Sequence, residues 1–351
     1  MTRGELGGPD DAASGCSGIG RPWPADRPFG HRRWPRRGLP AGASGSFAAS
    51  EARLRHDRRG ERSDPNGLAW FNAIKLGLAE EGWLDGVQIR IEARYTAGQP
   101  ELSDTYSNEL AALGPDVRVC GTNSNALNAQ RLLPDVTLVF VAVPDPIGIG
   151  LVRSFNQPGG NATGVAHFEA SIGGKQLLLL LDIAPLVRRV GYIYNPDVGS
   201  SSWQLILPYV QEAAAQAGVE LIEVPVRSLE EVDPAIASVA VLPDAGLLFP
   251  TNNWVSSNRF VFINAVNRHH IPALWAHTGI ETGPISYHVD TTEAFHQAGR
   301  LAGRILDGMH PSTLPVLGAP RYVMTANLRT AASLGLSVPH SILVAADRII
   351  E

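Results

Sequence analysis

The chain has 351 residues, of which 44% are hydrophobic and 18% are charged, and its formal net charge at pH 7 is −5. This length favours two domains of ordinary globular composition, and the acidic balance gives no electrostatic reason to expect nucleic-acid binding. Two cysteines, Cys16 and Cys120, are too few for a disulfide framework or a zinc site, and no run of about 18 apolar residues predicts a membrane span.

The first 63 residues lack the pattern of a folded domain. They are rich in Gly, Pro, Arg, Ala and Ser, contain the run RRWPRR at 32–37, and show no sustained strand or helix period. No apolar run of signal-peptide length follows the basic residues, so we expect no recognisable signal peptide. We therefore predict a disordered segment over 1–63, either natural or translated from a wrong reading frame. A basic arm that binds a nucleic acid or a protein partner is the alternative.

From residue 68 onward, helical and strand patterns alternate. Apolar spacing predicts helices over 68–82, 102–113 and 126–132, and strands over 87–93, 117–120 and 136–143. Such alternation is typical of a doubly wound parallel sheet. The apolar run at 136–143 stops at Pro144-Asp145-Pro146, because proline lacks the N–H that a strand ladder needs.

A second series of the same kind follows the break PGGN at 158–161. Helices are predicted over 174–183, 203–217, 229–239, 258–268, 291–307 and 328–334, and strands over 190–194, 219–224, 247–249, 273–276 and 285–289. The two series, joined near Gly160, predict two α/β lobes with a cleft between them.

Several segments together resemble one protein family. They are PGGNATGV (158–165), IGGKQLLLLLDIAPLVRRVGYIYNP (172–196), SYHVDTTEAFHQAGRLAGRILDGMHPSTLPV (286–316) and NLRTAASLGLSVPHSILVAADRIIE (327–351). In this order they are similar to the ABC-transporter substrate-binding proteins related to tryptophan- and tyrosine-binding proteins. The resemblance covers residues 64–351. It implies an α/β, type I periplasmic-binding-protein fold with two doubly wound lobes, a central cleft and a hinge, and neither catalytic machinery nor a cofactor.

The resemblance also divides the chain. It implies lobe 1 at 64–164 with about 285–309, lobe 2 at 165–284, and a C-terminal segment, 310–351, that packs on the lobes. Members of the family carry a signal peptide and a first strand ahead of the first helix. Neither is recognisable here, so we expect the central first strand to be absent and the chain, as written, to fold poorly.

The candidate ligand residues are polar side chains that follow strands, because ligands of doubly wound sheets bind at the carboxyl ends of strands and helix N-termini favour anions. Lobe 1 offers Thr122, Asn123, Ser124 and Asp145; lobe 2 offers Asn195, Asp197, Ser200, Ser201, Thr251 and Asn252; and Tyr287 lies near the last crossing. The structural alternative is helix N-capping for Thr122, Asn123 and Ser124, and a turn for Asp145. Trp254 and Trp275 either stack on a ligand or fill the core.

Together these features predict the periplasmic solute-binding component of an ABC uptake transporter, closing by a hinge on a small-molecule ligand such as an amino acid. The expected partners are that ligand and an ABC transporter permease. We expect the protein to be a monomer. We expect it to bind neither nucleic acid nor a metal, and not to insert stably into a membrane. No HExxH, GxSxG or GxxxxGK[ST] motif predicts catalysis. The alternatives are a cytosolic ligand sensor of the same fold, a non-functional truncated copy, or an enzyme of doubly wound fold, which the missing motifs disfavour.

Overall fold

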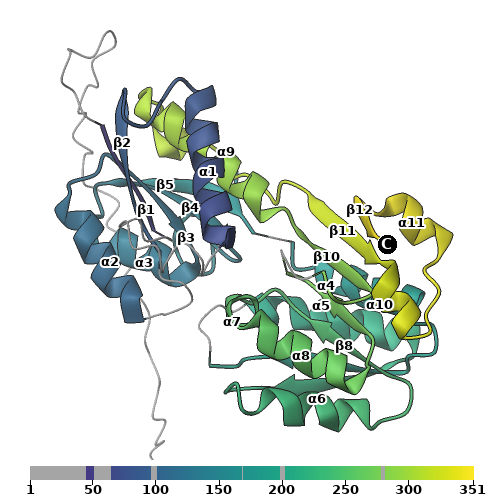
Figure 1. Ribbon diagram of the computed structural model, residues 1–351. Helices are drawn as coiled ribbons and strands as arrows, with labels where there is room; N and C mark the ends of the chain where they lie inside the picture. The colour runs from purple at the N-terminus through teal and green to yellow at the C-terminus, as the bar shows by residue number, and fades with distance from the viewer. Residues whose placement is uncertain (1–44, 51–64, 96–100, 168, 198–201, 278–280) are drawn as a thin grey trace, which may run out of the picture. The chain divides into compact units, whose positions relative to one another are not determined.

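The computed structural model describes residues 45–50, 65–95, 101–167, 169–197, 202–277 and 281–351. Their strands form two sheets (Figure 1). The first has the order β2-β1-β3-β4-β5 and the second the order β12-β11-β10-β9-β8-β6-β7. Among the described strands, β10 and β11 are antiparallel and all other neighbours are parallel.

The first sheet is built from β1 (Gly45–Ser50), β2 (Ile89–Arg94), β3 (Val117–Gly121), β4 (Thr137–Val143) and β5 (Ala162–Ala166). Strand β1 pairs in parallel with both β2 and β3 and is therefore central. The prediction of an absent first strand is wrong at Gly45–Ser50, which also lies within the segment predicted to be disordered. The strand was missed because GSFAAS contains no β-branched residue. Residues 1–44 and 51–64 lie outside the described residues.

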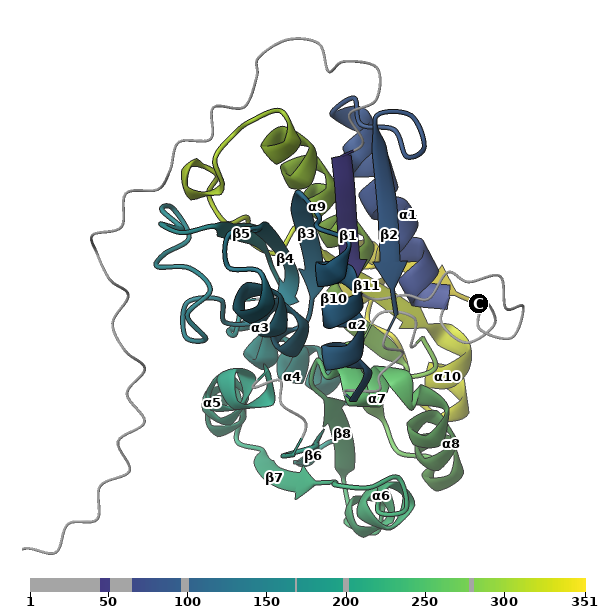
Figure 2. The same ribbon diagram turned by 90° about the vertical axis from the view of Figure 1, so that its left-hand side faces the viewer.

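Helices cover both faces of this sheet. One face carries α1 (Pro65–Glu80) and α9 (Thr291–Leu306), and the other carries α2 (Glu101–Ala112) and α3 (Asn123–Leu132) (Figure 2). Alternate side chains of β4 pack on opposite faces of the sheet. Val139 and Val141 belong to the core between the sheet and α1 and α9, and Leu138 and Phe140 belong to the core between the sheet and α3. The near-continuous apolar pattern of β4 follows from this burial on both sides.

The second sheet contains β6 (Arg189–Tyr194), β7 (Glu220–Pro225), β8 (Ala245–Phe249), β9 (Ala273–Trp275), β10 (Ile285–Val289), β11 (Tyr322–Asn327) and β12 (Arg348–Ile350). Its cores contain α4 (Ile172–Ile183) and α5 (Ser202–Ala217) on one face, and α6 (Val232–Ala240) and α8 (Arg259–His269) on the other. Short helices complete this part: α7 (Asn253–Ser257), α10 (Leu328–Ser333), α11 (His340–Ala345) and the 3-10 helix η1 (Pro311–Thr313).

The chain passes between the sheets after β5, after β10 and between η1 and β11. Because β5 completes the first sheet, the first passage follows Ala166 and not Gly160. Strand β10 lies in the second sheet, although we expected residues 285–309 in lobe 1, and only α9 packs on the first. All five residues of β10 are buried, so its sequence pattern suits either sheet equally. Residues 310–351 are divided too: Leu317 accepts a 2.8 Å hydrogen bond from the Ala166 N–H, whereas β11 and β12 extend the second sheet.

Candidate functional site

Strand β3 ends at a strained cap. Thr122 caps α3, with its Oγ1 accepting from the Asn125 N–H at 3.5 Å and lying 3.4 Å from the exposed Ser124 Oγ. Its backbone has φ 66° and ψ 155°, a combination that residues other than glycine rarely adopt. Strain of this kind costs of order 1–3 kcal/mol and gathers at binding sites and switch regions. The predicted capping role of Thr122 is therefore observed, in a conformation that points to more than capping.

Two asparagines at the start of α3 are buried. Asn125 is held through its Oδ1, which accepts from the Ser103 hydroxyl at 2.5 Å. Asn123 is 6% exposed, and its Oδ1 has no hydrogen-bond partner among the described residues. A buried polar atom without a partner costs about 1–3 kcal/mol. The first sheet therefore presents an unsatisfied acceptor at the carboxyl end of β3, suited to a donor from outside the chain.

Asp145 follows the end of β4 and belongs to a turn. Its Oδ1 accepts from the Gly148 N–H at 2.7 Å. Just before it, the pairing of β4 with β5 is interrupted between Val141 and Val143, and Ala142 between them has a φ of 56°. The turn role is therefore observed, and pairing of Asp145 with a ligand ammonium stays a prediction.

The carboxyl ends of β8 and β9 are joined by hydrogen bonds. The Asn252 N–H donates to Nε2 of His277 at 3.1 Å, and the Thr251 hydroxyl donates to the Ala276 carbonyl at 3.1 Å. Asn252 also caps α7, its Oδ1 accepting from the N–H groups of the second and third residues of that helix. Asn252 and His277 are each 2% exposed. Thr251 therefore has a structural partner, while Asn252 is a buried residue of the predicted site.

Sequence reasoning missed His277, although it is the second residue after β9 and the rule of polar residues after strands would have found it. Asn252 Nδ2 and His277 Nδ1 both lack a hydrogen-bond partner in the described part of the chain. The pKa of His277 is lowered to about 3, chiefly by burial; the Asn252 carbonyl oxygen, 3.2 Å from Nε2, acts to raise it, and charge on His288 or His167 lowers it. The imidazole is therefore neutral at physiological pH.

The other predicted residues of lobe 2 make contacts within the protein. Asn195 accepts from the Asp197 N–H at 2.8 Å, and the Asp197 carboxylate lies 3.3 Å from the Arg227 guanidinium. The Tyr287 hydroxyl accepts from Lys175 Nζ at 2.7 Å, which ties β10 to α4. Ser200 and Ser201 lie outside the described residues. These contacts do not bring Asn195 or Tyr287 together with Asn252.

The two tryptophans differ in their surroundings. Trp275 is fully buried and stacks on Phe249 at 4.0 Å between ring centroids, so it fills the core. Trp254 makes an edge-to-face contact with Phe262 at 5.3 Å.

Two more histidines, His167 and His288, lie beside the passages between the sheets. His167 is half-buried and directly follows β5, and His288 is buried in β10. Burial, and then charge on His288, lowers the pKa of His167 to about 4. Burial also lowers the pKa of His288, against the raising effects of the Val289 carbonyl and of Asp290, Glu281 and Asp347. With His277 they form a histidine cluster, in which charge on His288 lowers the pKa of both His167 and His277.

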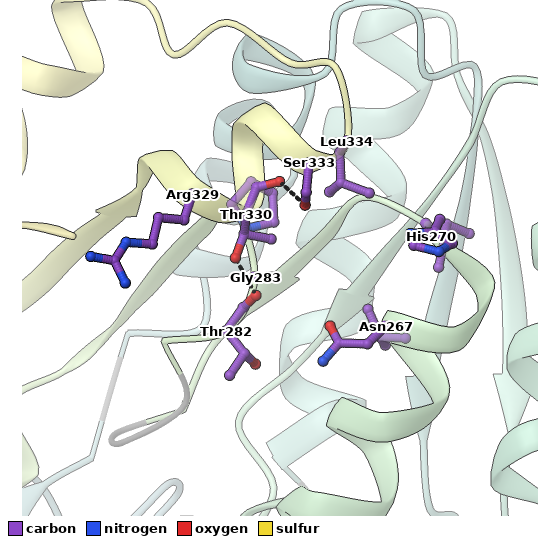
Figure 3. A pocket seen from close by; sticks show the side chains of 11 residues that line it. Asn267, His270, Thr282, Gly283, Arg329, Thr330, Ser333 and Leu334 are labelled. Atoms are coloured by element: carbon purple, nitrogen blue, oxygen red, sulfur yellow. Dashed lines mark hydrogen bonds between the residues drawn. The ribbon is translucent and has the colours of Figure 1, made fainter. Parts of the chain in front are cut away.

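A separate hollow of about 340 Å³ lies at the end of the second sheet that is opposite to Asn252 and His277 (Figure 3). It is formed by the end of α8, the loop before β10, and α10, and Arg329 extends away from Asn267 and His270 (Figure 3). This is the amino edge of the parallel strands β9 and β10, whereas ligands of doubly wound sheets bind at the carboxyl edge. We therefore do not place the candidate site here.

The described residues contain neither a group of metal ligands nor a membrane-spanning helix. In that part of the chain, no group of three or more His, Cys, Asp or Glu side chains is placed to hold a metal ion. No helix within those ranges combines the length and apolar character needed to cross a membrane.

Comparison with known proteins adds sequence and fold relationships. A sequence profile of the family described as ABC transporter substrate binding protein matches residues 63–350. The tyrosine-binding protein of Clostridioides difficile is 26% identical over 261 residues, which is 74% of each chain.

Solved structures share the fold. A domain from Streptococcus pneumoniae in complex with L-Trp matches with a TM-score of 0.73 at 23% identity, covering 87% of this chain and 100% of that one. A conserved domain protein from Vibrio cholerae matches with a TM-score of 0.76 at 25% identity, covering 88% and 100%. The predicted fold class, two α/β lobes of the periplasmic-binding-protein type, is confirmed, as is the family resemblance noted from the sequence.

Proposed function

This chain belongs to the ABC transporter substrate-binding proteins, and we propose that it is the solute-binding component of an uptake transporter whose ligand is an aromatic amino acid. The family is a class of binding proteins and not of enzymes. One observation carries the proposal: buried polar atoms that find no partner among the described residues lie at the carboxyl edges of both sheets, at Asn123 in the first and at Asn252 and His277 in the second. The ligand class comes from the relatives, one named for tyrosine and one crystallised with L-Trp.

The proposed mechanism is hinge closure. The lobes would turn about the three segments that pass between the sheets, so that Asn123 and the Asn252–His277 pair act on one ligand. The closed, loaded protein would then deliver the ligand unchanged to a permease. We propose that it acts as a monomer outside the cytoplasm, without a cofactor and without binding nucleic acid.

A thermal-shift experiment tests the proposal directly. The full-length protein is heated with L-tryptophan, L-tyrosine, glycine, L-glutamate or D-glucose. A ligand that binds only the folded state adds about 2.7 kcal/mol at a concentration of 100 times Kd. We expect the aromatic amino acids alone to raise Tm, and chromatography to recover them unchanged. A protein that is folded by circular dichroism, yet shifted by neither aromatic amino acid, would contradict the proposal.

A further inference from the structure

We propose that His277 and Asn252 form the carboxylate-binding part of the ligand site, with His277 Nδ1–H and Asn252 Nδ2–H as the donors. The inference rests on the proposed function, because it specifies how an amino-acid ligand is held. It adds a residue, His277, that neither the sequence nor the comparisons assign.

The proton position on His277 follows from the hydrogen bonds around Asn252. Nε2 of His277 lies 3.1 Å from the Asn252 nitrogen and 3.2 Å from its carbonyl oxygen. That oxygen already accepts from the Ser256 N–H at 3.1 Å and from the Ser256 hydroxyl at 3.3 Å. The Asn252 N–H can only donate, and Nε2 is the acceptor it has. Nε2 is therefore the unprotonated nitrogen, and the neutral ring carries its proton on Nδ1.

The amide orientation of Asn252 is fixed in the same way. Its Oδ1 accepts from the Trp254 N–H at 2.8 Å and from the Val255 N–H at 3.3 Å. The NH₂ group must then occupy the other position, and Nδ2 has no acceptor among the described residues. The two residues in contact thus leave two buried donors, neither of which meets an acceptor in the part of the chain that the structure describes.

Two such donors select the chemistry of the ligand. A group with two acceptor oxygens and negative charge satisfies both, and hydrogen bonds from neutral donors to a charged acceptor are stronger than neutral ones. The acidic side chains that act on His288 in this cluster are engaged elsewhere: Glu281 lies 2.6 Å from Arg348, Asp290 lies 2.7 Å from Arg321, and Asp347 accepts from the Met324 N–H at 2.8 Å. A ligand carboxylate therefore fits these donors better than an ammonium or an apolar group.

The positions of Asn252 and His277 in the second sheet also support their assignment as carboxylate donors. Strands β8 and β9 are parallel neighbours, so their carboxyl ends lie side by side. The bond from Thr251 to the Ala276 carbonyl fixes the two loops to each other. The donors are thus held before a ligand arrives, which reduces the ordering that binding requires.

Two variants remove one donor each and keep the structural hydrogen bond. His277→Gln places an amide oxygen near Nε2, where it accepts from the Asn252 N–H, but it has no donor at Nδ1. Asn252→Asp keeps the oxygen that caps α7 and replaces the donor with a second oxygen that repels a carboxylate. His270→Gln, the same chemical change at the exposed end of α8, is the matched control.

The experiment measures Kd for L-tryptophan and for tryptamine, which lacks the carboxylate, with all four proteins by calorimetry. We expect each site variant to weaken L-tryptophan binding by roughly 10- to 100-fold, the usual range for losing a hydrogen bond to a charged group. Tryptamine binding should be unchanged by His277→Gln, which also shows that the variant is folded, and His270→Gln should match the wild type. If the wild type prefers L-tryptophan but both variants keep the full preference, the carboxylate assignment is wrong and the proposed function stands. If the folded wild type binds neither L-tryptophan nor L-tyrosine, the proposed function is wrong, and this inference, which rests on it, is wrong too.

Discussion

Gly299 of α9 lies directly against the backbone of Ile74 in α1. A Cβ at Gly299 would overlap the Ile74 carbonyl oxygen and lie 3.0 Å from its carbonyl carbon. Gly77 of α1 meets the backbone of His296 in the same way. Backbone atoms in packed helices cannot yield as a flexible side chain can, so these two glycines set how closely α1 and α9 approach.

The first prediction concerns this contact. Gly299→Ala should lower the free energy of unfolding by about 1–3 kcal/mol, as overpacking does in cores. Gly160→Ala is the control, because a Cβ there meets no atom within 4 Å and its φ is not positive; its effect should stay within about 0.5 kcal/mol. Urea unfolding measures both. Equal midpoints for the two variants would show that the helices are not in close contact.

The second prediction concerns the strand at Gly45–Ser50. Ala48 pairs with Glu92 of β2 and with Arg118 of β3, so its backbone lies inside the sheet. Ala48→Pro supplies no N–H and should destabilise the protein by several kcal/mol, whereas Ala48→Val keeps the N–H and should be tolerated far better. Equal urea midpoints for the two variants would mean that this segment is not a central strand.

The third prediction concerns acid. His167 and His277 have folded pKa values of about 4 and about 3, below the usual 6.5, so the unfolded chain binds more protons as pH falls. Their contribution to stability is complete above pH 6.5 and is lost as pH falls from 6.5 toward 4 and 3. Together they should give a slope of up to about 2.7 kcal/mol per pH unit.

The variant His167→Gln isolates this effect from that of the carboxylates. Urea unfolding between pH 7.5 and 4.5 should show a slope smaller by up to about 1.4 kcal/mol per pH unit than in the wild type. A wild-type slope in His167→Gln would show that this imidazole is not buried in its neutral form.

The fourth prediction separates binding from folding at Asn123. Asn123→Leu replaces the amide with an apolar group of similar size and removes the buried oxygen that has no partner within the described ranges. Stability should be retained or rise by up to about 1–3 kcal/mol, while the affinity for the aromatic amino acid falls at least roughly tenfold. Urea unfolding and calorimetry provide the two values. A loss of stability together with unchanged affinity would make Asn123 a structural residue.

Much of the fold was predictable because the local pattern of each element agrees with its burial. The apolar run at 136–143 became β4, and the amphipathic pattern at 291–307 became α9. Strand β5 was not predicted, because its sequence ATGVA shows only a weak strand pattern. Its pairing with β4 and with Leu317 decides its structure. The tail elements α11 and β12 were also missed. Strand patterns alone do not reveal which sheet receives β10, since burial on both faces looks the same in either.

The site was predictable only in part, because the sequence shows which polar residues follow strands but not which of their atoms find partners. Polar residues after strands drew attention to Asn123 and Asn252, whose unsatisfied atoms are visible only in the folded chain. His277 meets Asn252 across 25 residues of sequence, and its proton position depends on what Ser256 donates. Such relationships arise from tertiary packing, so no local pattern carries them.

Calorimetric titration of the full-length protein with L-tryptophan and L-tyrosine shows directly whether both lobes hold one ligand. We predict saturable binding of one ligand per chain, which weakens in Asn123→Leu and in His277→Gln because groups of both lobes hold the ligand. Binding that neither variant weakens would contradict this placement of the site. The absence of binding heat from a folded protein with either amino acid would contradict the proposed function itself.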